Sequence, residues 1–306
     1  MLLAACGGGG GSSNGNGDSS NGNGELSGSV DVDGSSTVFP ITEAVAEEFL
    51  RIAPGVRVPV GNSGTGGGFK KFCAGETDIS DASRPIQQSE IEACEAADVE
   101  YIEVLVGLDG LAVVTGIDND FLSAGLTSEQ LATIFGAPSE GTVTRWNQVD
   151  PSWPDEEIEI YAPDTDSGTF DFFNEEITED IGGSRADYTA STDDNVLVVG
   201  ISGDDNTIGY FGYAYYAENE NLLRIIPVDG VIPTDETVAD GSYRLARPLF
   251  IYVRVDSLRD KPQVREFVRF YLSDEAIGLV GEVGYTAVTA DDISASRRLV
   301  EAAIGG

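Results

Sequence analysis

The sequence VEYIEVLVG at residues 99–107 runs directly into LDGLAVVT at residues 108–115. Each stretch is an apolar run of strand length, so each predicts a strand. The first strand ends one series of alternating strands and helices, and the second begins another. Such alternation is typical of a largely parallel sheet. The junction near residue 108 therefore predicts two α/β lobes.

Segments on both sides of this junction keep the alternation. Residues 41–54 space their apolar side chains as a helix does, and Pro54 and Gly55 end that helix. A helix is also expected to follow the glycine-rich stretch at 61–72. The remaining predicted strands lie at 27–33, 56–61, 77–80, 157–163 and 245–254, and the remaining helices at 89–97, 127–136, 169–178 and, as a pair, within 261–284.

The predicted fold class is α/β, with two lobes, each a mainly parallel sheet flanked by helices. Residues 26–107 with 255–306 are assigned to lobe 1, and residues 108–254 to lobe 2. Open sheets of this kind bind ligands at the carboxyl ends of their strands. A ligand cleft is therefore expected between the lobes.

Residues 1–25 are not expected to join either core. Residues 7–25 have a Gly/Ser/Asn-rich composition without an apolar side chain, which is typical of a flexible tether. LLAAC at residues 2–6 resembles a bacterial lipobox with Cys6 as the lipidated residue, although the basic segment and most of the apolar segment of a signal peptide are missing. A chance LAAC is the alternative. The predicted membrane contact is a lipid anchor alone.

Three Ser/Thr/Gly turns precede predicted helices: DGSSTVFP at 33–40, NSGTGGGF at 62–69 and TDSGTF at 165–170. A helix start presents unpaired N–H groups and a partial positive charge. One such turn is ordinarily a helix cap. Three turns spread over both lobes predict a site for a tetrahedral oxyanion.

Ser167 in the third turn could instead be a nucleophile. The chain contains no histidine, which excludes a Ser-His-Asp triad and any histidine-supported metal site. A Ser-Lys dyad would need one of the three lysines, Lys70, Lys71 or Lys261. The SGT sequence also lacks the second glycine of a G-x-S-x-G turn. We therefore predict a ligand donor at Ser167, no enzymatic activity, no metal and no cofactor.

The charge of the chain excludes another class of function. It has 53 acidic and 17 basic residues, a net charge of −36, which argues against nucleic-acid binding. The hydrophobic content of 41% is that of a folded protein. An acidic, lysine-poor folded protein resembles those of salt-adapted organisms, where high ionic strength screens the mutual repulsion.

Two cysteines, Cys73 and Cys94, fall inside the predicted fold. Outside the cytoplasm such a pair is expected to form a disulfide. A buried pair of free thiols is the alternative. Zinc is a poor alternative, since two cysteines without histidine do not complete a four-ligand site.

The motifs together resemble the extracytoplasmic phosphate-binding proteins of ABC importers. SGTGGGFKKFCAGETDISDASRPI at residues 63–86 and DSGTFDFF at 166–173 carry most of the resemblance, which spans nearly the whole folded part. It implies a type II periplasmic-binding-protein fold that closes on a dehydrated phosphate. It also implies a monomeric receptor on the periplasmic or extracellular face that delivers phosphate to the permease subunits of an ABC transporter.

The resemblance also implies the phosphate ligands, taken motif by motif. They are hydroxyls and backbone amides of the three turns: Ser36, Thr37, Val38, Ser63, Thr65, Gly66, Ser167, Gly168 and Thr169.

Two positions depart from the pattern of many relatives. Pro163 stands where they place an arginine, and Ser83 stands where they place an aspartate. We infer that Arg84 supplies the missing cation and Asp81 the missing carboxylate. A cap or surface ion pair is the alternative role for Arg84, and a solvated or capping acid is the alternative for Asp81. If Arg84 is not the cation, Arg145 and Arg247 are the next candidates.

Other functions remain open at this point. The ligand could be sulfate, molybdate or tungstate. A secreted enzyme or adhesin on the same fold is a further alternative. The missing histidine weighs against an enzyme, and Trp146 and Trp153 are expected to be packing residues rather than an adhesive patch.

The net charge of −36 leads to a prediction about salt. Raising KCl from about 0.1 M to about 2 M should raise the melting temperature, because the Debye length falls from about 10 Å to below 3 Å. Calorimetric melting curves at both concentrations test this, with a near-neutral protein of similar size as control. Equal melting temperatures would contradict the inferred salt adaptation.

Overall fold

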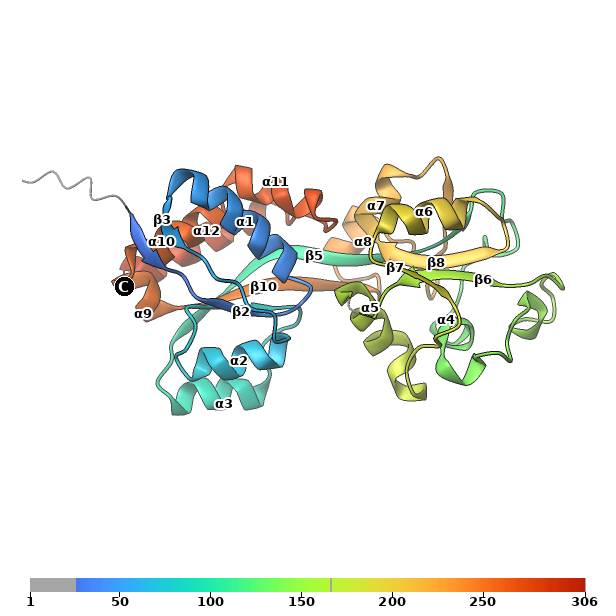
Figure 1. The fold of residues 1–306 in the computed structure, drawn as a ribbon, viewed down its shortest axis with the longest axis horizontal. Coiled ribbons are helices and arrows are strands. Elements are labelled where there is room, and N and C mark those ends of the chain that lie inside the picture. The colour runs from blue at the N-terminus through green and yellow to red at the C-terminus, as the bar shows by residue number, and fades with distance from the viewer. Residues whose placement is uncertain (1–25, 166, 306) are drawn as a thin grey trace, which may run out of the picture.

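The computed structural model describes residues 26–165 and 167–305. It confirms the predicted α/β fold in two lobes, which lie side by side along the long axis of the molecule in Figure 1. The Cys6 prediction and the tether lie outside the described residues.

Lobe 1 contains the first and last parts of the chain. Helices cover both faces of its sheet, with α1 on one side and α2 and α3 on the other (Figure 1). Its elements are β1 (Ser27–Ser29), β2 (Val32–Gly34), α1 (Phe39–Ile52), β3 (Gly55–Arg57), α2 (Thr65–Cys73), β4 (Ile79–Ala82), α3 (Gln88–Ala96), α9 (Val255–Asp260), α10 (Pro262–Tyr271), α11 (Asp274–Glu282) and α12 (Ala290–Gly305).

Lobe 2 contains the middle of the chain. Its helical segments are α4 (Ser128–Phe135), η1 (Ala137–Ser139), η2 (Trp146–Gln148), α5 (Gly168–Phe173), the π-helical η3 (Asn174–Thr178), η4 (Glu179–Ile181), α6 (Asp194–Ser202), α7 (Tyr213–Glu218) and α8 (Asp235–Ala239). Its strands are β6 (Glu159–Pro163), β7 (Thr189–Ser191), β8 (Thr207–Gly212) and β9 (Leu223–Ile225).

Two long strands, β5 (Tyr101–Gly116) and β10 (Ala246–Arg254), join the lobes (Figure 1). The prediction of separate strands at 99–107 and 108–115 was wrong, because β5 is continuous across the junction. β5 pairs antiparallel with β10 along this passage, and the register shifts between Leu249 and Phe250. The ladder of hydrogen bonds explains the continuity, since it stabilises both halves as one strand.

The sheet is mixed rather than mainly parallel. β2 pairs parallel with β4, and β6 pairs parallel with β7 and β8, as the alternation of strands and helices predicts. The joining strands are antiparallel to their neighbours β4 and β8. Two smaller predictions also fail: residues 27–33 form two short strands, and a third terminal helix, α12, follows the predicted pair.

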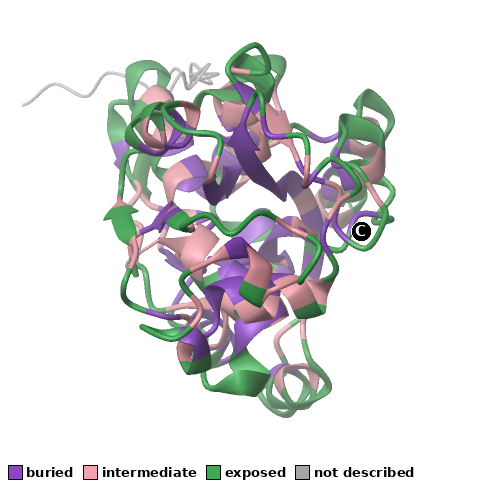
Figure 2. Cartoon of the chain, turned by 90° about the vertical axis from the view of Figure 1, so that its right-hand side faces the viewer, coloured by how far each residue is buried: buried purple, intermediate pink, exposed green. Residues whose placement is uncertain are grey.

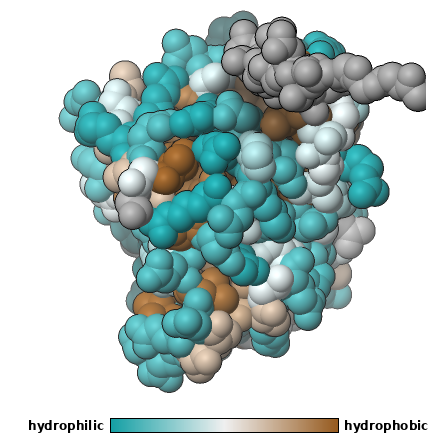
Figure 3. Space-filling model, turned by 90° about the vertical axis from the view of Figure 1, so that its left-hand side faces the viewer, coloured by the Kyte–Doolittle hydropathy of each residue, from teal (hydrophilic) through white to brown (hydrophobic). Residues whose placement is uncertain are grey.

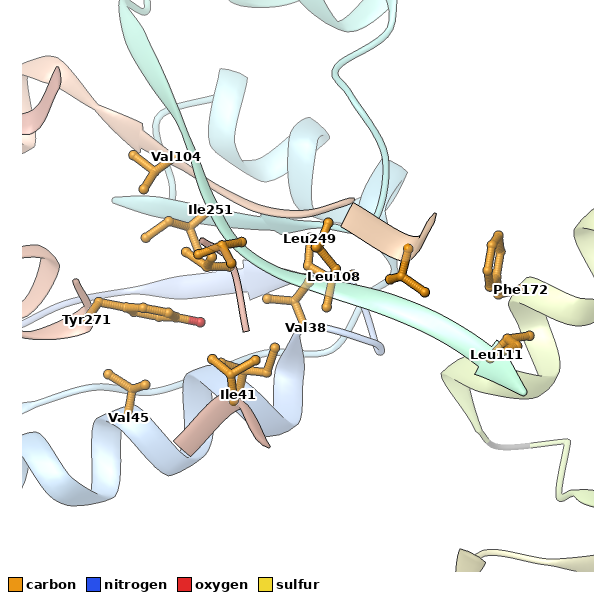
Figure 4. Close-up of a cluster of buried hydrophobic side chains, with 14 of the residues drawn as sticks. Val38, Ile41, Val45, Val104, Leu108, Leu111, Phe172, Leu249, Ile251 and Tyr271 are labelled. Carbon is orange, nitrogen blue, oxygen red and sulfur yellow. The ribbon is translucent and has the colours of Figure 1, made fainter. Parts of the chain in front are cut away.

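A buried apolar core runs through both lobes. Figure 4 shows Val38 and Ile41 beside Leu108 and Leu249 of the joining strands, with Phe172 on the lobe 2 side. The exposed residues form an outer shell around this core in Figure 2, and the end face of lobe 1 in Figure 3 is mostly hydrophilic. Trp146 and Trp153 pack against each other, with ring centroids 6.0 Å apart, as predicted.

The predicted disulfide between Cys73 and Cys94 is present and connects the end of α2 to α3. Phe69, Phe72 and Tyr252 pack around it in a separate apolar cluster of lobe 1. The bridge therefore holds α2, which begins at one of the three turns, against its neighbouring helix.

Removing this bridge should destabilise the protein. The two cysteines are 21 residues apart, and closing a loop of this length contributes about 3 kcal/mol in the chain-entropy model. We expect Cys73→Ser with Cys94→Ser to lower the free energy of unfolding by roughly this amount, measured by urea denaturation. Two thiols that react with an alkylating reagent in the native, unreduced protein would contradict the bridge.

A polar group is also buried in lobe 1, where Asp81 of β4 is fully buried between neighbours that include Thr42 of α1 and Tyr271 of α10. The Thr42 and Tyr271 hydroxyls are 2.9 Å apart. Neither carboxylate oxygen of Asp81 has a hydrogen-bond partner of normal geometry among the described residues. Burial raises the pKa of Asp81 to about 8, with Thr42 opposing the shift and the charge of Asp33 adding to it.

This raised pKa should appear in the pH dependence of stability. In the folded protein Asp81 keeps its proton at pH values where the unfolded chain, with a pKa of about 4, has released it. The contribution of this proton to the free energy of unfolding is therefore full below about pH 4 and is lost as the pH rises towards about 8. Asp81→Asn cannot titrate. The stability of wild type relative to Asp81→Asn should fall by up to about 1.4 kcal/mol per pH unit across this window.

Urea denaturation at fixed salt, from about pH 4 to about pH 8, measures this difference. Asp120→Asn, an exposed aspartate of lobe 2, is the control. A stability difference between wild type and Asp81→Asn that does not change with pH would show that Asp81 stays ionised.

Candidate functional site

The three predicted turns each lead into a helix, as the sequence indicated. Residues 35–38 precede α1, residues 62–64 precede α2, and Ser167 precedes α5. The first and third turns meet across the two lobes: a Cβ atom built on Gly168 would lie 2.5 Å from Thr37 Oγ1. The lobes are therefore in van der Waals contact at this point.

The first turn is held to lobe 1 by its own backbone. The Ser35 N–H donates to the Asp81 carbonyl (2.9 Å), and the Thr37 N–H donates to Ser35 Oγ (3.2 Å). Among the described residues, the N–H groups of Ser36 and Val38 have no acceptor. Since α1 has no side-chain cap either, its start can donate to an anion.

The hydroxyl groups of Ser63 and Thr65, in the second turn, have different hydrogen-bond partners. Ser63 donates its hydroxyl and its backbone N–H to Asp33, which also receives Lys71 Nζ at 2.5 Å. Burial opposes ionisation of Asp33, but the hydrogen bonds from Lys71 and Ser63 lower its pKa below the ordinary value. Thr65 Oγ1 instead lies 3.2 Å from Ser83 Oγ. Thr65 and Ser83 thus form a hydroxyl pair at the start of α2, beside Gly66.

The third turn caps α5 of lobe 2. Ser167 Oγ accepts a hydrogen bond from the Thr169 N–H (3.1 Å), and the Ser167 carbonyl accepts from the Asp171 N–H. Thr169 is in the first turn of this short helix. Ser167 is therefore a helix cap whose hydroxyl donates to no acceptor among the described residues and so can donate to a ligand.

Arg84 lies beside the second turn but is committed to another partner. Its Nη1 and Nη2 atoms donate to the two carboxylate oxygens of Glu90, both at 2.9 Å. Glu90 also accepts from the Gln87 N–H at the start of α3. The hydrogen bond with Glu90 is the main cause that raises the pKa of Arg84. The structure thus places Arg84 in a local ion pair at a helix cap.

The side chain of Asp81 is likewise engaged elsewhere, inside lobe 1. Its backbone carbonyl supports Ser35, whereas its side chain is enclosed with Thr42 and Tyr271 inside lobe 1. Its exposed fraction is 0%. A ligand contact for Arg84 or Asp81 thus stays a prediction from the sequence, and it requires a rearrangement of the described side chains.

A different arginine, Arg247 of β10, lies where the first and third turns meet. Its Nη2 donates to Thr37 Oγ1 of lobe 1 at 2.8 Å and to the Gly168 carbonyl of lobe 2 at 2.9 Å. The ring of Phe172 covers the guanidinium, with Cζ 4.1 Å from the ring centroid. One cation therefore touches both lobes.

Asp109 of β5 holds this arginine in place. The two residues are opposite each other in the β5–β10 register, and Asp109 Oδ2 lies 3.1 Å from both Nε and Nη2 of Arg247. Only 1% of Asp109 is exposed, and burial raises its pKa although Arg247 opposes the shift. Among the described residues, Arg247 Nη1 has no hydrogen-bond acceptor. Since Nε and Nη2 are engaged, Nη1 is the donor that remains for a ligand.

No role was predicted from the sequence for Asp109 or Ser83, and Arg247 was a second choice for the cation. One signal was available: Arg247 stands at the start of an apolar strand, where an arginine is rarely buried without a partner. The pairing with Asp109, 138 residues away, could not be read from the chain.

The described residues contain no cluster of acidic, cysteine or histidine side chains that could hold a metal ion. Their helices also include none that is long and apolar enough to cross a bilayer.

Comparison with known proteins places this architecture in a family. The model of the PBP superfamily domain matches residues 19–275. Protein SphX from Synechococcus elongatus is 48% identical over 273 residues, which are 87% of this chain and 80% of the relative. The phosphate-binding protein PstS of Staphylococcus saprophyticus is 39% identical over 310 residues, covering 100% of this chain and 92% of the relative.

Solved structures agree with these matches. A possible phosphate binding protein from Planctomyces limnophilus superposes with a TM-score of 0.86 at 43% identity, covering 91% of this chain and 99% of that one. A phosphate ABC transporter substrate-binding protein from Clostridium perfringens, solved with bound phosphate, gives a TM-score of 0.56 at 27% identity over 86% of this chain and 100% of that one. The chain therefore belongs to the PstS-like family of substrate-binding proteins within the PBP superfamily.

Proposed function

We propose that this protein binds inorganic phosphate between its lobes and delivers it to an ABC importer on the extracytoplasmic side of the membrane. The observation that carries this proposal is Arg247, which is hydrogen-bonded to both lobes at the meeting point of two helix starts. The names of the relatives support phosphate as the ligand.

The chemistry of the cleft suits a tetrahedral anion. The starts of α1, α2 and α5 present backbone N–H groups, and Thr37, Thr65, Ser83, Ser167 and Thr169 add hydroxyls. Backbone amides at helix starts bind oxyanions without full positive charges. Hydroxyls can donate to an ionised oxygen or accept from a protonated one, which fits phosphate near neutral pH.

We assign the cationic role to Arg247 rather than to Arg84. Both Nη atoms of Arg84 already donate to Glu90 in a bidentate pair, and Glu90 in turn accepts from the Gln87 N–H at the start of α3. Arg247 keeps Nη1 for the ligand while Asp109 fixes the plane of the guanidinium. A planar, pre-oriented guanidinium loses little freedom on binding an oxyanion.

The pairing with Asp109 also determines how the positive charge of Arg247 contributes to phosphate binding. Because Asp109 offsets the charge of Arg247, the pair supplies directed N–H donors with little net charge. The charge of the phosphate is then met mainly by amides and hydroxyls.

The cellular setting follows from the sequence. We propose that the protein is a monomer of a salt-adapted organism, held to the membrane through a lipid on Cys6 by the tether at residues 7–25. Labelling with a palmitate analogue, lost in Cys6→Ser, tests the anchor.

Calorimetry with phosphate tests the site. Arg247→Ala should weaken phosphate binding by about thirtyfold or more, since truncating a buried, hydrogen-bonded cation costs about 2–5 kcal/mol. Arg84→Ala should weaken it by roughly threefold at most, because both Nη atoms of Arg84 already donate to Glu90, whereas Arg247 keeps Nη1 for the ligand. Arg145→Ala removes one positive charge from a partly exposed arginine of lobe 2, and it is therefore the control for the change in net charge.

Arg247→Ala leaves Asp109 buried without its partner, so the variant could fail through misfolding. The double variant Arg247→Gln with Asp109→Asn removes both charges together and leaves neither one buried without its partner, and it should also bind phosphate poorly while melting cooperatively. Normal binding by this double variant would show that the cation lies elsewhere. Wild type that binds sulfate or molybdate but not phosphate would overturn the proposed ligand.

A further inference from the structure

Gly168 lies at a close contact between the lobes, where α5 meets the first turn. A Cβ atom at this position would lie 2.5 Å from Thr37 Oγ1, 3.0 Å from Thr37 Cα and 3.1 Å from Thr37 N. Two of these three atoms are backbone, which cannot rotate away as a flexible side chain can. A methyl group at residue 168 would therefore push α5 and the first turn apart.

The backbone at Gly168 does not itself require glycine. Its φ is not among the positive values that occur at other glycines of the chain, and it is the first residue of α5. Alanine can adopt this conformation without strain. The need for glycine comes from the opposite lobe, not from the local conformation.

The same contact determines the geometry around Arg247. One nitrogen, Nη2, reaches Thr37 Oγ1 at 2.8 Å and the Gly168 carbonyl at 2.9 Å, and Phe172 of the same helix covers the guanidinium. Moving α5 away would lengthen at least one of these hydrogen bonds. It would also move the N–H groups of α5 away from those of α1.

We infer that Gly168 determines how closely the lobes approach and thereby the size of the tetrahedral anion that fits between them. This inference rests on the proposed function. Donors on α1 and α5 face the ligand from opposite lobes, so their separation has to match the span of the anion. Phosphate is smaller than molybdate and tungstate, which share its shape. The contact of a bare Cα with Thr37 favours the smaller anion.

Gly168→Ala tests the inference. It should weaken phosphate binding about tenfold or more, because stretched hydrogen bonds to an ion lose much of their strength. Molybdate and tungstate should lose less, so the ratio of phosphate to molybdate affinity should fall. Gly168→Ser, with a larger side chain, should shift the ratio at least as far. Gly278→Ala is the matched control, since a Cβ on this helical glycine meets nothing within 4 Å.

Calorimetry with each anion at one salt concentration and mildly alkaline pH gives the ratios. Small-angle X-ray scattering with saturating phosphate measures whether the two residue-168 variants are wider than the Gly278→Ala control. If both variants keep the wild-type ratio of phosphate to molybdate affinity, because all three anions lose affinity equally or not at all, the inference is overturned. Gly168 would then act as an amide donor alone. Wild type that binds none of the anions would overturn the proposed function, and this inference with it.

Discussion

The ion pair between Arg247 and Asp109 is the interaction on which the cleft depends. It joins the two strands that pass between the lobes, at a point where both residues are almost entirely buried. A buried ion pair is stable only when its remaining hydrogen bonds are satisfied. Here Arg247 Nη2 donates to Thr37 of lobe 1 and to the Gly168 carbonyl of lobe 2, so the stability of the pair is linked to the contact between the lobes. Asp109 Oδ1 and Arg247 Nη1 have no hydrogen-bond partner among the described residues.

An anion site in a protein of net charge −36 is physically consistent with this arrangement. Charges on the surface are screened beyond about 10 Å at moderate salt, whereas donors in a closed cleft act at short range and with little screening. The cleft therefore needs oriented amides and hydroxyls rather than an excess of positive charge. We therefore expect the acidic surface to affect stability and solubility in salt, and the helix starts to bind the anion.

Much of the fold could be predicted because its signals are local. Apolar spacing located α1, and the Ser/Thr/Gly turns located the starts of α1, α2 and α5. The arginine that contacts both lobes was a second choice from the sequence, for a physical reason. Arg84 is close in sequence to the turns, but Glu90, six residues further along the chain, captures it as part of a helix cap. Asp81 is also close in sequence, but it points into lobe 1 against Thr42.

The sequence by itself determined the two lobes, the disulfide partners and the three helix starts, because each depends on neighbouring residues or on the pairing of the two cysteines that fall inside the predicted fold. Only the tertiary structure decided which arginine lies in the cleft. That choice depends on the register of β5 against β10, which brings together residues 138 positions apart. It also depends on how closely the two lobes approach each other at Thr37 and Gly168. This contact involves backbone atoms, which every residue has, so the glycine at position 168 is its only trace in the sequence.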